Sequence, residues 1–229
     1  MSGHAYSAQA GPSRRGVTGP RRSGPASALG VAALCVAALA MLWAVAALVP
    51  SAHYRDAVLL RDFTLMNGPQ VDRVGNFVLH LLDPMLFILW GIAIVAFALA
   101  RLRPRVALAV VAVMALAPFT AETLKPLLAH GHVTLDYVKV GAASWPSGHA
   151  TAAFALVLSA VLVAPRRLRP LVAVLGAAFA AAVGVFLLIL AWHMPSDVLG
   201  GYLVAALWTA LALALLRAAE RRWPTGRPI

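Results

Sequence analysis

The sequence predicts an all-α protein, a polytopic membrane helical bundle with six transmembrane helices. Three observations lead to this fold class. Of the 229 residues, 62% are hydrophobic and only 12% are charged. The mean hydropathy of +0.84 is unlike the balance of a soluble domain. The apolar residues are gathered in runs that can each cross roughly 30 Å of hydrocarbon, and short basic turns separate the runs.

Membrane topology explains the formal net charge of +11 better than a nucleic-acid partner does. Nearly all of the positive residues are arginines, and they stand in short clusters between the apolar runs rather than along one face or in a long tail. The single cysteine, Cys35, lies inside the first apolar run, so the sequence offers neither a disulfide framework nor a metal-ligand spacing. We therefore expect no nucleic acid, no bound metal and no cofactor.

Six apolar runs account for the expected spans. Residues 1–27, which precede them, are rich in Gly, Ser, Pro and Arg, so we expect a disordered, basic cytoplasmic tail. The first run is longer than a signal-peptide core of about 7 to 15 residues, which favours a retained helix. The expected spans are residues 28–49, 77–100, 106–120, 151–164, 171–192 and 198–216. The membrane domain then covers residues 28–217, and a cytoplasmic tail follows at 218–229.

Residues 51–76, between the first two spans, are too polar to cross a bilayer. Charged residues of both signs alternate there with large apolar residues, which suits a helix that lies in the membrane interface. The sequence Asn67-Gly68-Pro69 is expected to break this helix. The stretch fits an entrance for lipid and a plain amphipathic connector equally well.

The distribution of basic residues predicts the orientation of the chain. Lys and Arg accumulate in short cytoplasmic loops. Of the 19 Lys and Arg residues, four lie in the N-terminal tail, three in each of the turns at 101–105 and 166–169, and four after Leu216. Both termini are therefore expected in the cytoplasm. The strong use of Ala, Arg and Val with little Lys is typical of GC-rich bacterial genomes, so we expect a multi-pass protein of a bacterial plasma membrane.

The residues that can carry chemistry are expected to meet at the extracytoplasmic face. Residues 145–149, Trp-Pro-Ser-Gly-His, open the fourth span, and a helix start behind Ser and Gly offers unpaired N–H groups to a phosphate. His193 and Asp197 are four residues apart, and with Pro195 as the first helical residue the carboxylate could orient the imidazole. Two spans separate His149 from His193, so the chain crosses out and back and returns both histidines to one face.

These residues resemble the phosphatidic acid phosphatase type 2 superfamily, membrane lipid phosphatases with six spans. The second motif of that family, Pro-Ser-Gly-His, is intact at residues 146–149. Its third motif, Ser-Arg followed by five residues, His, three residues and Asp, keeps His193 and Asp197. The resemblance covers roughly residues 77–216.

Two phosphate-binding arginines of the family are absent from their expected places. The first motif, Lys followed by six residues and Arg-Pro, keeps Lys125 but has His132-Val133 in place of Arg-Pro. In the third motif, Phe186-Leu187 stands where the family has Ser-Arg. Three residues of the loop before the fourth span could supply the missing positive charge: His130, His132 and Lys139.

The resemblance implies a reaction that needs no metal. By this likeness His193 attacks phosphorus to form a phosphohistidine, Asp197 orients it, and His149 protonates the leaving oxygen. Water then hydrolyses the intermediate. The residues expected to hold the phosphate oxygens are Lys125, Ser147, Gly148, His132 and Lys139.

We therefore expect a membrane lipid phosphatase that hydrolyses the terminal phosphate of a lipid phosphate or diphosphate, of the polyprenyl diphosphate or phosphatidate type, at the extracytoplasmic face. The alternative is a non-catalytic lipid-phosphate-binding protein or a partner subunit of an envelope complex, kept after the arginines were lost. A transporter is disfavoured because the sequence shows no internal repeat. The sequence does not indicate an oligomeric state.

Overall fold

The computed structural model describes residues 24–133, 135 and 138–224, and every regular element in this part of the chain is a helix. Most of the predicted N-terminal tail and the last five residues of the C-terminal one lie outside the described residues. The helices are α1 (Pro25–Leu48), α2 (Pro50–Thr64), α3 (Pro69–His80), α4 (Pro84–Ala100), α5 (Pro104–Leu127), α6 (Gly148–Val163), α7 (Arg169–Ile189) and α8 (Pro195–Arg222).

Proline defines where most of these helices begin. It is the first residue of six described helices and the second residue of α7. Proline suits the first turn because the N–H that it lacks would have no partner within the helix. Helix α6 begins differently, at Gly148, with Ser147 as its N-cap.

The predicted fold class is confirmed, whereas the number of six spans holds only approximately. Each expected span corresponds to a helix, namely α1, α4, α5, α6, α7 or α8. Four of these helices, α1, α5, α7 and α8, are long and apolar enough to cross a membrane. Helices α3 and α4 could form a fifth span that is bent by 52°. Helix α6 is apolar but has only 16 residues.

The second span does not begin where the sequence suggested. Residues 77–80 belong to α3, and a turn separates them from the start of α4 at Pro84. Asp83, the residue before the proline, is extended, with φ −52° and ψ 146°. A residue before proline avoids the helical conformation, so Asp83-Pro84 interrupts the helix within the expected span.

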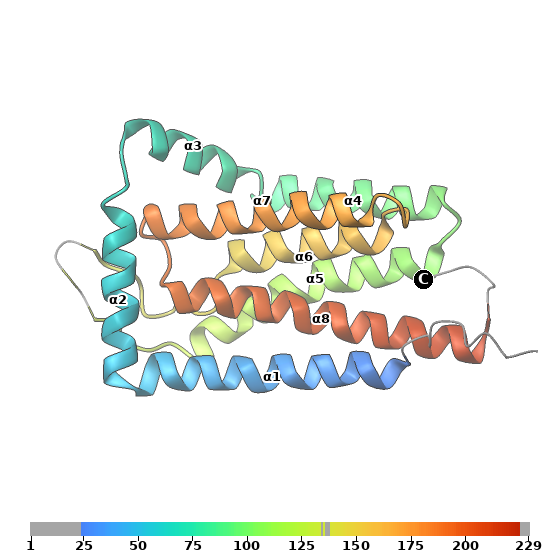
Figure 1. The fold of residues 1–229 in the computed structure, drawn as a ribbon, viewed down its shortest axis with the longest axis horizontal. Helices are drawn as coiled ribbons and strands as arrows, with labels where there is room; N and C mark the ends of the chain where they lie inside the picture. The colour runs from blue at the N-terminus through green and yellow to red at the C-terminus, as the bar shows by residue number, and fades with distance from the viewer. Residues whose placement is uncertain (1–23, 134, 136–137, 225–229) are drawn as a thin grey trace, which may run out of the picture.

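The long helices lie side by side, and α2 crosses one end of the bundle (Figure 1). The chain turns from α1 into α2 at Val49, which is extended before Pro50. The predicted break of the polar stretch is confirmed, because α2 ends at Thr64 and α3 begins at Pro69. Helix α6 lies inside the bundle, where it contacts α4, α5, α7 and α8.

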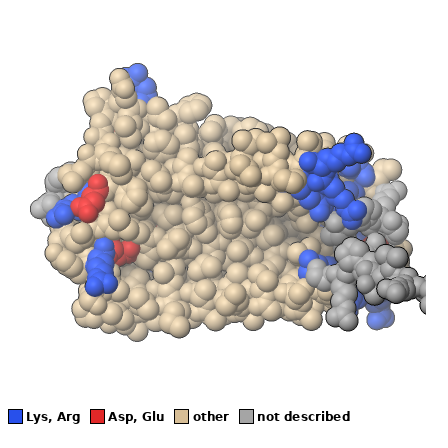
Figure 2. All heavy atoms as spheres, in the orientation of Figure 1, with Lys and Arg blue, Asp and Glu red and all other residues tan. Residues whose placement is uncertain are grey.

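Arginines gather at the end of the molecule opposite α2 (Figure 2). Arg105, the second residue of α5, donates to the backbone oxygen of Trp223 at 2.7 Å and pairs with Glu220 at 3.3 Å. Arg217 near the end of α8 donates to the backbone oxygen of Gly24, before α1, at 3.3 Å. The start of α1, the end of α8 and the basic turns therefore share one end of the bundle. That this end faces the cytoplasm stays a prediction.

Candidate active site

Two segments that are far apart in the sequence meet at the end of the bundle where α2 lies. The backbone N–H of Ser147, before α6, donates to the backbone oxygen of Asp197 in α8 at 2.9 Å. Two glycines of α8 allow this approach. A Cβ on Gly201 would lie only 2.6 Å from the Ser147 oxygen, and one on Gly200 would lie 2.9 Å from the indole nitrogen of a buried tryptophan, Trp145.

His193 and Asp197 form a buried pair at the start of α8. The His193 Nδ1 and Asp197 Oδ2 atoms are 3.3 Å apart, and the same oxygen accepts a hydrogen bond from the Met194 backbone N–H at 2.9 Å. Asp197 is fully buried and His193 is 9% exposed. An ionised carboxylate only accepts hydrogen bonds, so a neutral His193 carries its proton on Nδ1. This leaves the lone pair of Nε2 available to react.

His149 lies close to this pair in the first turn of α6. Its ring packs edge-on against Trp192, the residue before His193, with 5.5 Å between the ring centroids. His149 and His193 are near enough to interact electrostatically. The turn that carries His149 is held by Ser147, whose Oγ accepts a hydrogen bond from the Ala150 N–H at 3.3 Å. The imidazole of His149 in α6 and that of His193 just before α8 are thus neighbours.

Lys125 reaches the start of α6 from the last turn of α5. A Cβ on Gly148 would lie 3.4 Å from Lys125 Nζ and 2.6 Å from Glu122 Oε1. Both side chains therefore lie against the Gly148 backbone, beside the first N–H groups of α6, which have no partner within the helix. Lys125 Nζ donates to Glu122 Oε1 at 2.6 Å. The ammonium group consequently shares its charge with a carboxylate whose involvement was not predicted.

Three histidines form a cluster beside the site, with ring centroids 4.8 to 6.1 Å apart. They are His53 of α2 and His130 and His132 of the loop between α5 and α6. His53 Nε2 accepts a hydrogen bond from the Val133 backbone N–H at 3.0 Å, which ties α2 to the loop. His132 Nε2 lies 3.0 Å from the Ser144 hydroxyl. Within the described part of the chain, no group of three or more His, Cys, Asp and Glu side chains is arranged to hold a metal ion.

The two positions that lack an arginine hold different kinds of side chain. Burial lowers the pKa of His132 below its ordinary value, although Asp197 acts in the opposite direction. The imidazole is therefore mostly neutral at pH 7 and lacks the permanent charge of a guanidinium. Leu187 is fully buried in the core, and Phe186 packs against Gly75 of α3. The third-motif positions thus serve packing.

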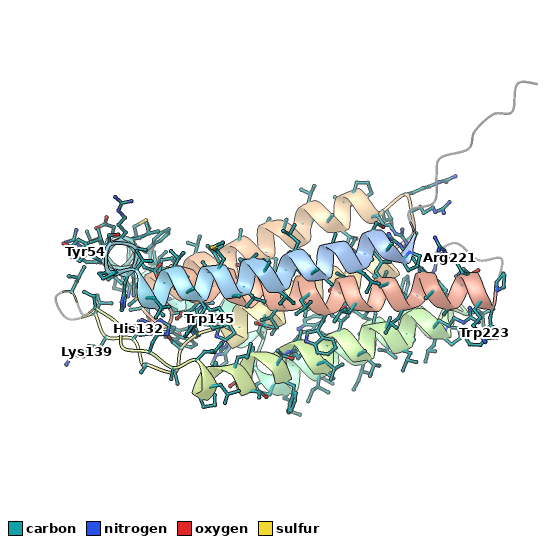
Figure 3. The ribbon with its side chains drawn as sticks, turned by 90° about the horizontal axis from the view of Figure 1, so that it is seen from below. Tyr54, His132, Lys139, Trp145, Arg221 and Trp223 are labelled. Atoms are coloured by element: carbon teal, nitrogen blue, oxygen red, sulfur yellow. The ribbon has the colours of Figure 1, made fainter. Side chains whose placement is uncertain are left out.

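Lys139 does not join the other residues expected at the site. Its side chain is exposed, and Figure 3 shows it extending outward from the loop, away from His132 and Trp145. The sequence suggested Lys139 because it lies in the same polar loop as the histidines. Composition does not reveal the backbone turns that decide the direction of a loop side chain.

Besides Glu122, the structure brings a second acidic residue to the site that the sequence did not single out. Asp56 of α2 accepts hydrogen bonds from both the backbone N–H and the hydroxyl of Ser196, at 3.2 and 2.6 Å. Burial raises the pKa of Asp56 above its ordinary value. In the sequence Asp56 was one of several balanced charges. The available signal was its spacing of three residues from His53, which puts both side chains on one face of a helix.

The comparisons with known proteins agree with this architecture. The sequence matches the PAP2 superfamily over residues 85–221, which is more than half of the chain. The fold is similar to that of a crystal structure of a transmembrane PAP2 type phosphatidylglycerolphosphate phosphatase from Bacillus subtilis, with a TM-score of 0.61 and 18% sequence identity. That similarity covers 89% of this chain and 98% of the other. No curated protein sequence matches the chain significantly. Because the matched residues include His149, His193 and Asp197, the site and the sequence match agree that this chain belongs to the PAP2 superfamily.

Proposed function

We propose that this protein is a membrane lipid phosphatase that transfers the terminal phosphate of a lipid phosphate or diphosphate to His193 and then to water. The observation that carries the proposal is the buried pair of His193 and Asp197, 3.3 Å apart, beside the first turn of α6 with His149. Membership of the PAP2 superfamily supports a phosphatase reaction.

In the first step the lone pair of His193 Nε2 attacks phosphorus. A bond forms between Nε2 and phosphorus, the bond from phosphorus to the leaving oxygen breaks, and His149 gives that oxygen a proton. Asp197 holds the Nδ1 proton of His193 and stabilises the positive charge that develops on the ring. In the second step water attacks phosphorus while His149 takes a proton from it; a bond forms between the water oxygen and phosphorus, the bond between phosphorus and His193 Nε2 breaks, and inorganic phosphate leaves.

The phosphate oxygens are held by positive charge and N–H groups at preset positions, as phosphoryl transfer requires. Lys125 supplies the charge, and the N–H groups of Gly148 and His149 point from the start of α6. Ser147 is fully buried, so its part is to cap the turn and to link it to α8. His132 adds an imidazole at the edge of the site and charges only in acid.

Membership of the PAP2 superfamily and the apolar helices of the bundle support a lipid as the substrate. The similar Bacillus subtilis protein is named for phosphatidylglycerolphosphate, a lipid phosphate. For this chain we propose a lipid phosphate of the phosphatidate or polyprenyl diphosphate type, whose tail stays in the membrane while its head reaches His193. The basic residues at the far end of the bundle favour a cytoplasmic location for that end, so the site faces outside.

The test is phosphate release by the purified full chain in detergent, with prenyl diphosphate or phosphatidate as substrate, no added metal, and a chelator present. We expect turnover by the wild type and none above background by His193→Ala. His80→Ala is the matched control, because it also removes one imidazole, from a side chain that is 74% exposed. A His193→Ala variant as active as the wild type would exclude the phosphohistidine mechanism.

A non-catalytic lipid-phosphate binder is the second candidate, and one observation favours it. Leu187, at the place of a family arginine, is buried in the core and offers no charge to a phosphate. A binder would take up the same lipids in a vesicle or detergent binding assay and release no phosphate. If the protein is a binder, the His193→Asn variant should keep its full biological activity, whereas the same variant of a phosphatase should lose it.

A further inference from the structure

Helix α2 reaches the active-site pair through a single acidic side chain. It lies across the end of the bundle (Figure 1), and Figure 3 views it nearly along its axis. Asp56 accepts two hydrogen bonds from Ser196, one from the backbone N–H at 3.2 Å and one from the hydroxyl at 2.6 Å. The two residues are 140 positions apart in the sequence. Ser196 is buried and immediately precedes Asp197.

We propose that Asp56 is a positioning residue, which holds the first turn of α8 so that Asp197 points at His193. This inference rests on the proposed phosphatase function for its kinetic consequence. Asp56 touches neither the reacting phosphate nor His193 in this scheme. It acts through Ser196 on the carboxylate that orients the nucleophile.

The hydrogen bonds of the Asp197 carboxylate explain why its turn needs an anchor in addition to the Ser147 N–H, which donates to the Asp197 backbone oxygen at 2.9 Å. Both hydrogen bonds to its carboxylate, from Met194 and His193, go to Oδ2. Oδ1 is buried and has no hydrogen-bond partner among the described residues. The direction of the carboxylate therefore depends on the backbone of the turn that carries it, and a shift of that turn would move Oδ2 away from His193.

Asp56 is suited to fix that turn. The N–H groups of the first turn of a helix have no partner within the helix, and Asp56 captures the one of Ser196. A negative charge at this place also interacts favourably with the helix dipole of α8. Hydrogen bonds to a carboxylate are stronger than neutral ones, and partial burial of Asp56 protects these two from water.

Asp62 on the same helix provides a matched comparison. It is an exposed carboxylate that pairs with its own neighbour, Arg61, at 2.9 Å. Substituting either aspartate removes one negative charge from α2, but only Asp56→Ala cuts a contact to α8. The two variants therefore separate the loss of an anchor from the loss of a charge.

The kinetic experiment is a double-mutant cycle on the purified full chain. We expect Asp56→Ala to lower kcat about 10- to 100-fold with little change in KM, because misplacement of about 1 Å costs up to about 100-fold. Asp56→Ala with Ser196→Ala should be no slower than Asp56→Ala alone, since the hydroxyl hydrogen bond that Ser196→Ala removes is already absent in Asp56→Ala. Asp62→Ala should match the wild type. Unchanged kcat in Asp56→Ala, additive effects in the double variant, or an equal loss in Asp62→Ala would each overturn the inference.

A second variant covers the case in which Asp56→Ala does not fold. The amide oxygen of Asp56→Asn can still accept one of the two hydrogen bonds. The kcat of this variant should therefore be lower than that of the wild type, and higher than that of Asp56→Ala or, if Asp56→Ala does not fold, higher than background. If this folded variant has the kcat of the wild type, the carboxylate is not needed for positioning and the inference is wrong.

A measurement that needs no turnover separates this inference from the proposed function. In protein labelled with ¹⁵N-histidine, the His193 signals are those lost in His193→Ala. Asp56→Ala should shift the Nδ1 signal of His193, and Asp62→Ala should leave it unchanged. If the wild type releases no phosphate and Asp56→Ala still shifts the His193 signal, the phosphatase function is refuted and the role of Asp56 is supported. An active wild type whose His193 signal is the same in both variants would refute the role of Asp56 alone.

Discussion

The two ends of helix α6 are built from opposite kinds of groups. At the C-terminal end, Arg103 Nη1 donates to the backbone oxygen of Val163 at 3.2 Å. Arg169 Nε donates to the backbone oxygen of Ala164, also at 3.2 Å. At the N-terminal end, Ser147 caps the first turn and the first N–H groups are available to an anion. The helix dipole favours cations at the C-terminal end and anions at the N-terminal end.

This difference shows how the protein divides its charge. Arginines at the basic end donate hydrogen bonds to the backbone oxygens at the C-terminal ends of helices, and these bonds stabilise the turns between helices. The opposite end holds the buried Asp197, the half-buried Asp56, several imidazoles and Lys125, the groups that the proposed phosphate transfer uses or positions. Substitutions at the two ends should therefore have different consequences: loss of turnover at the site end and loss of stability at the basic end.

The largest effect is expected from Asp197→Asn. The amide would no longer hold the Nδ1 proton of His193 as a carboxylate does, and kcat should fall by about 10³-fold or more, as when the orienting carboxylate of a catalytic triad is replaced. Initial rates of phosphate release measure this. Circular dichroism should show an unchanged helix content. A loss of less than tenfold would mean that Asp197 does not orient a nucleophile.

A smaller effect at the same end is expected from Gly148→Ala. The new Cβ would lie 2.6 Å from Glu122 Oε1, so this carboxylate must move, and we expect Lys125 Nζ, which pairs with it at 2.6 Å, to move with it. Displacing the ammonium group should reduce kcat/KM by about tenfold, because phosphate stabilisation depends on groups at preset positions. Gly131→Ala is the control, since a Cβ there would meet nothing within 4 Å. Equal activity of the two variants would place Lys125 outside the reaction.

Arg103→Ala tests the basic end. The substitution removes the hydrogen bond to Val163 and should cost about 1 kcal/mol of unfolding free energy, the usual contribution of one such bond. The melting temperature in detergent should fall by a few degrees, while kcat well below that temperature stays at the wild-type value. Arg166→Ala, at an exposed position of the next basic turn, should leave both quantities unchanged. A loss of kcat in Arg103→Ala would contradict the division between the two ends.

The smallest effect is expected on the pH dependence of stability, from the protonation of His132. Burial lowers the pKa of His132 in the folded protein below the value of about 6.5 of a free histidine. As the pH falls through 6.5, the unfolded chain takes up this proton more readily than the folded one, so stability decreases. The melting temperature of His132→Asn should therefore fall less between pH 7 and pH 5 than that of the wild type. Equal falls would show that His132 does not contribute.

Much of the architecture could be predicted from the sequence because it depends on local properties. Hydrophobic runs marked every helix of the bundle, and Asn67-Gly68-Pro69 marked the break between α2 and α3. The clustering of arginines at one end followed from counting residues between the runs. Pro195 marked the start of α8 next to His193. Each of these features is set by residues that are neighbours along the chain.

Tertiary structure decided the features that depend on the direction of side chains and on distant partners. The contact of Asp56 with Ser196 joins residues 140 positions apart, and no local pattern reports it. Composition placed Lys139 in the polar loop, but the backbone points it outward. Glu122 and Lys125 are three residues apart on α5 and can pair locally, but only the packing of α5 against α6 places this pair beside Gly148. Hydrophobicity along the chain determines which segments enter the membrane, whereas the packing of helices against one another determines which polar groups meet.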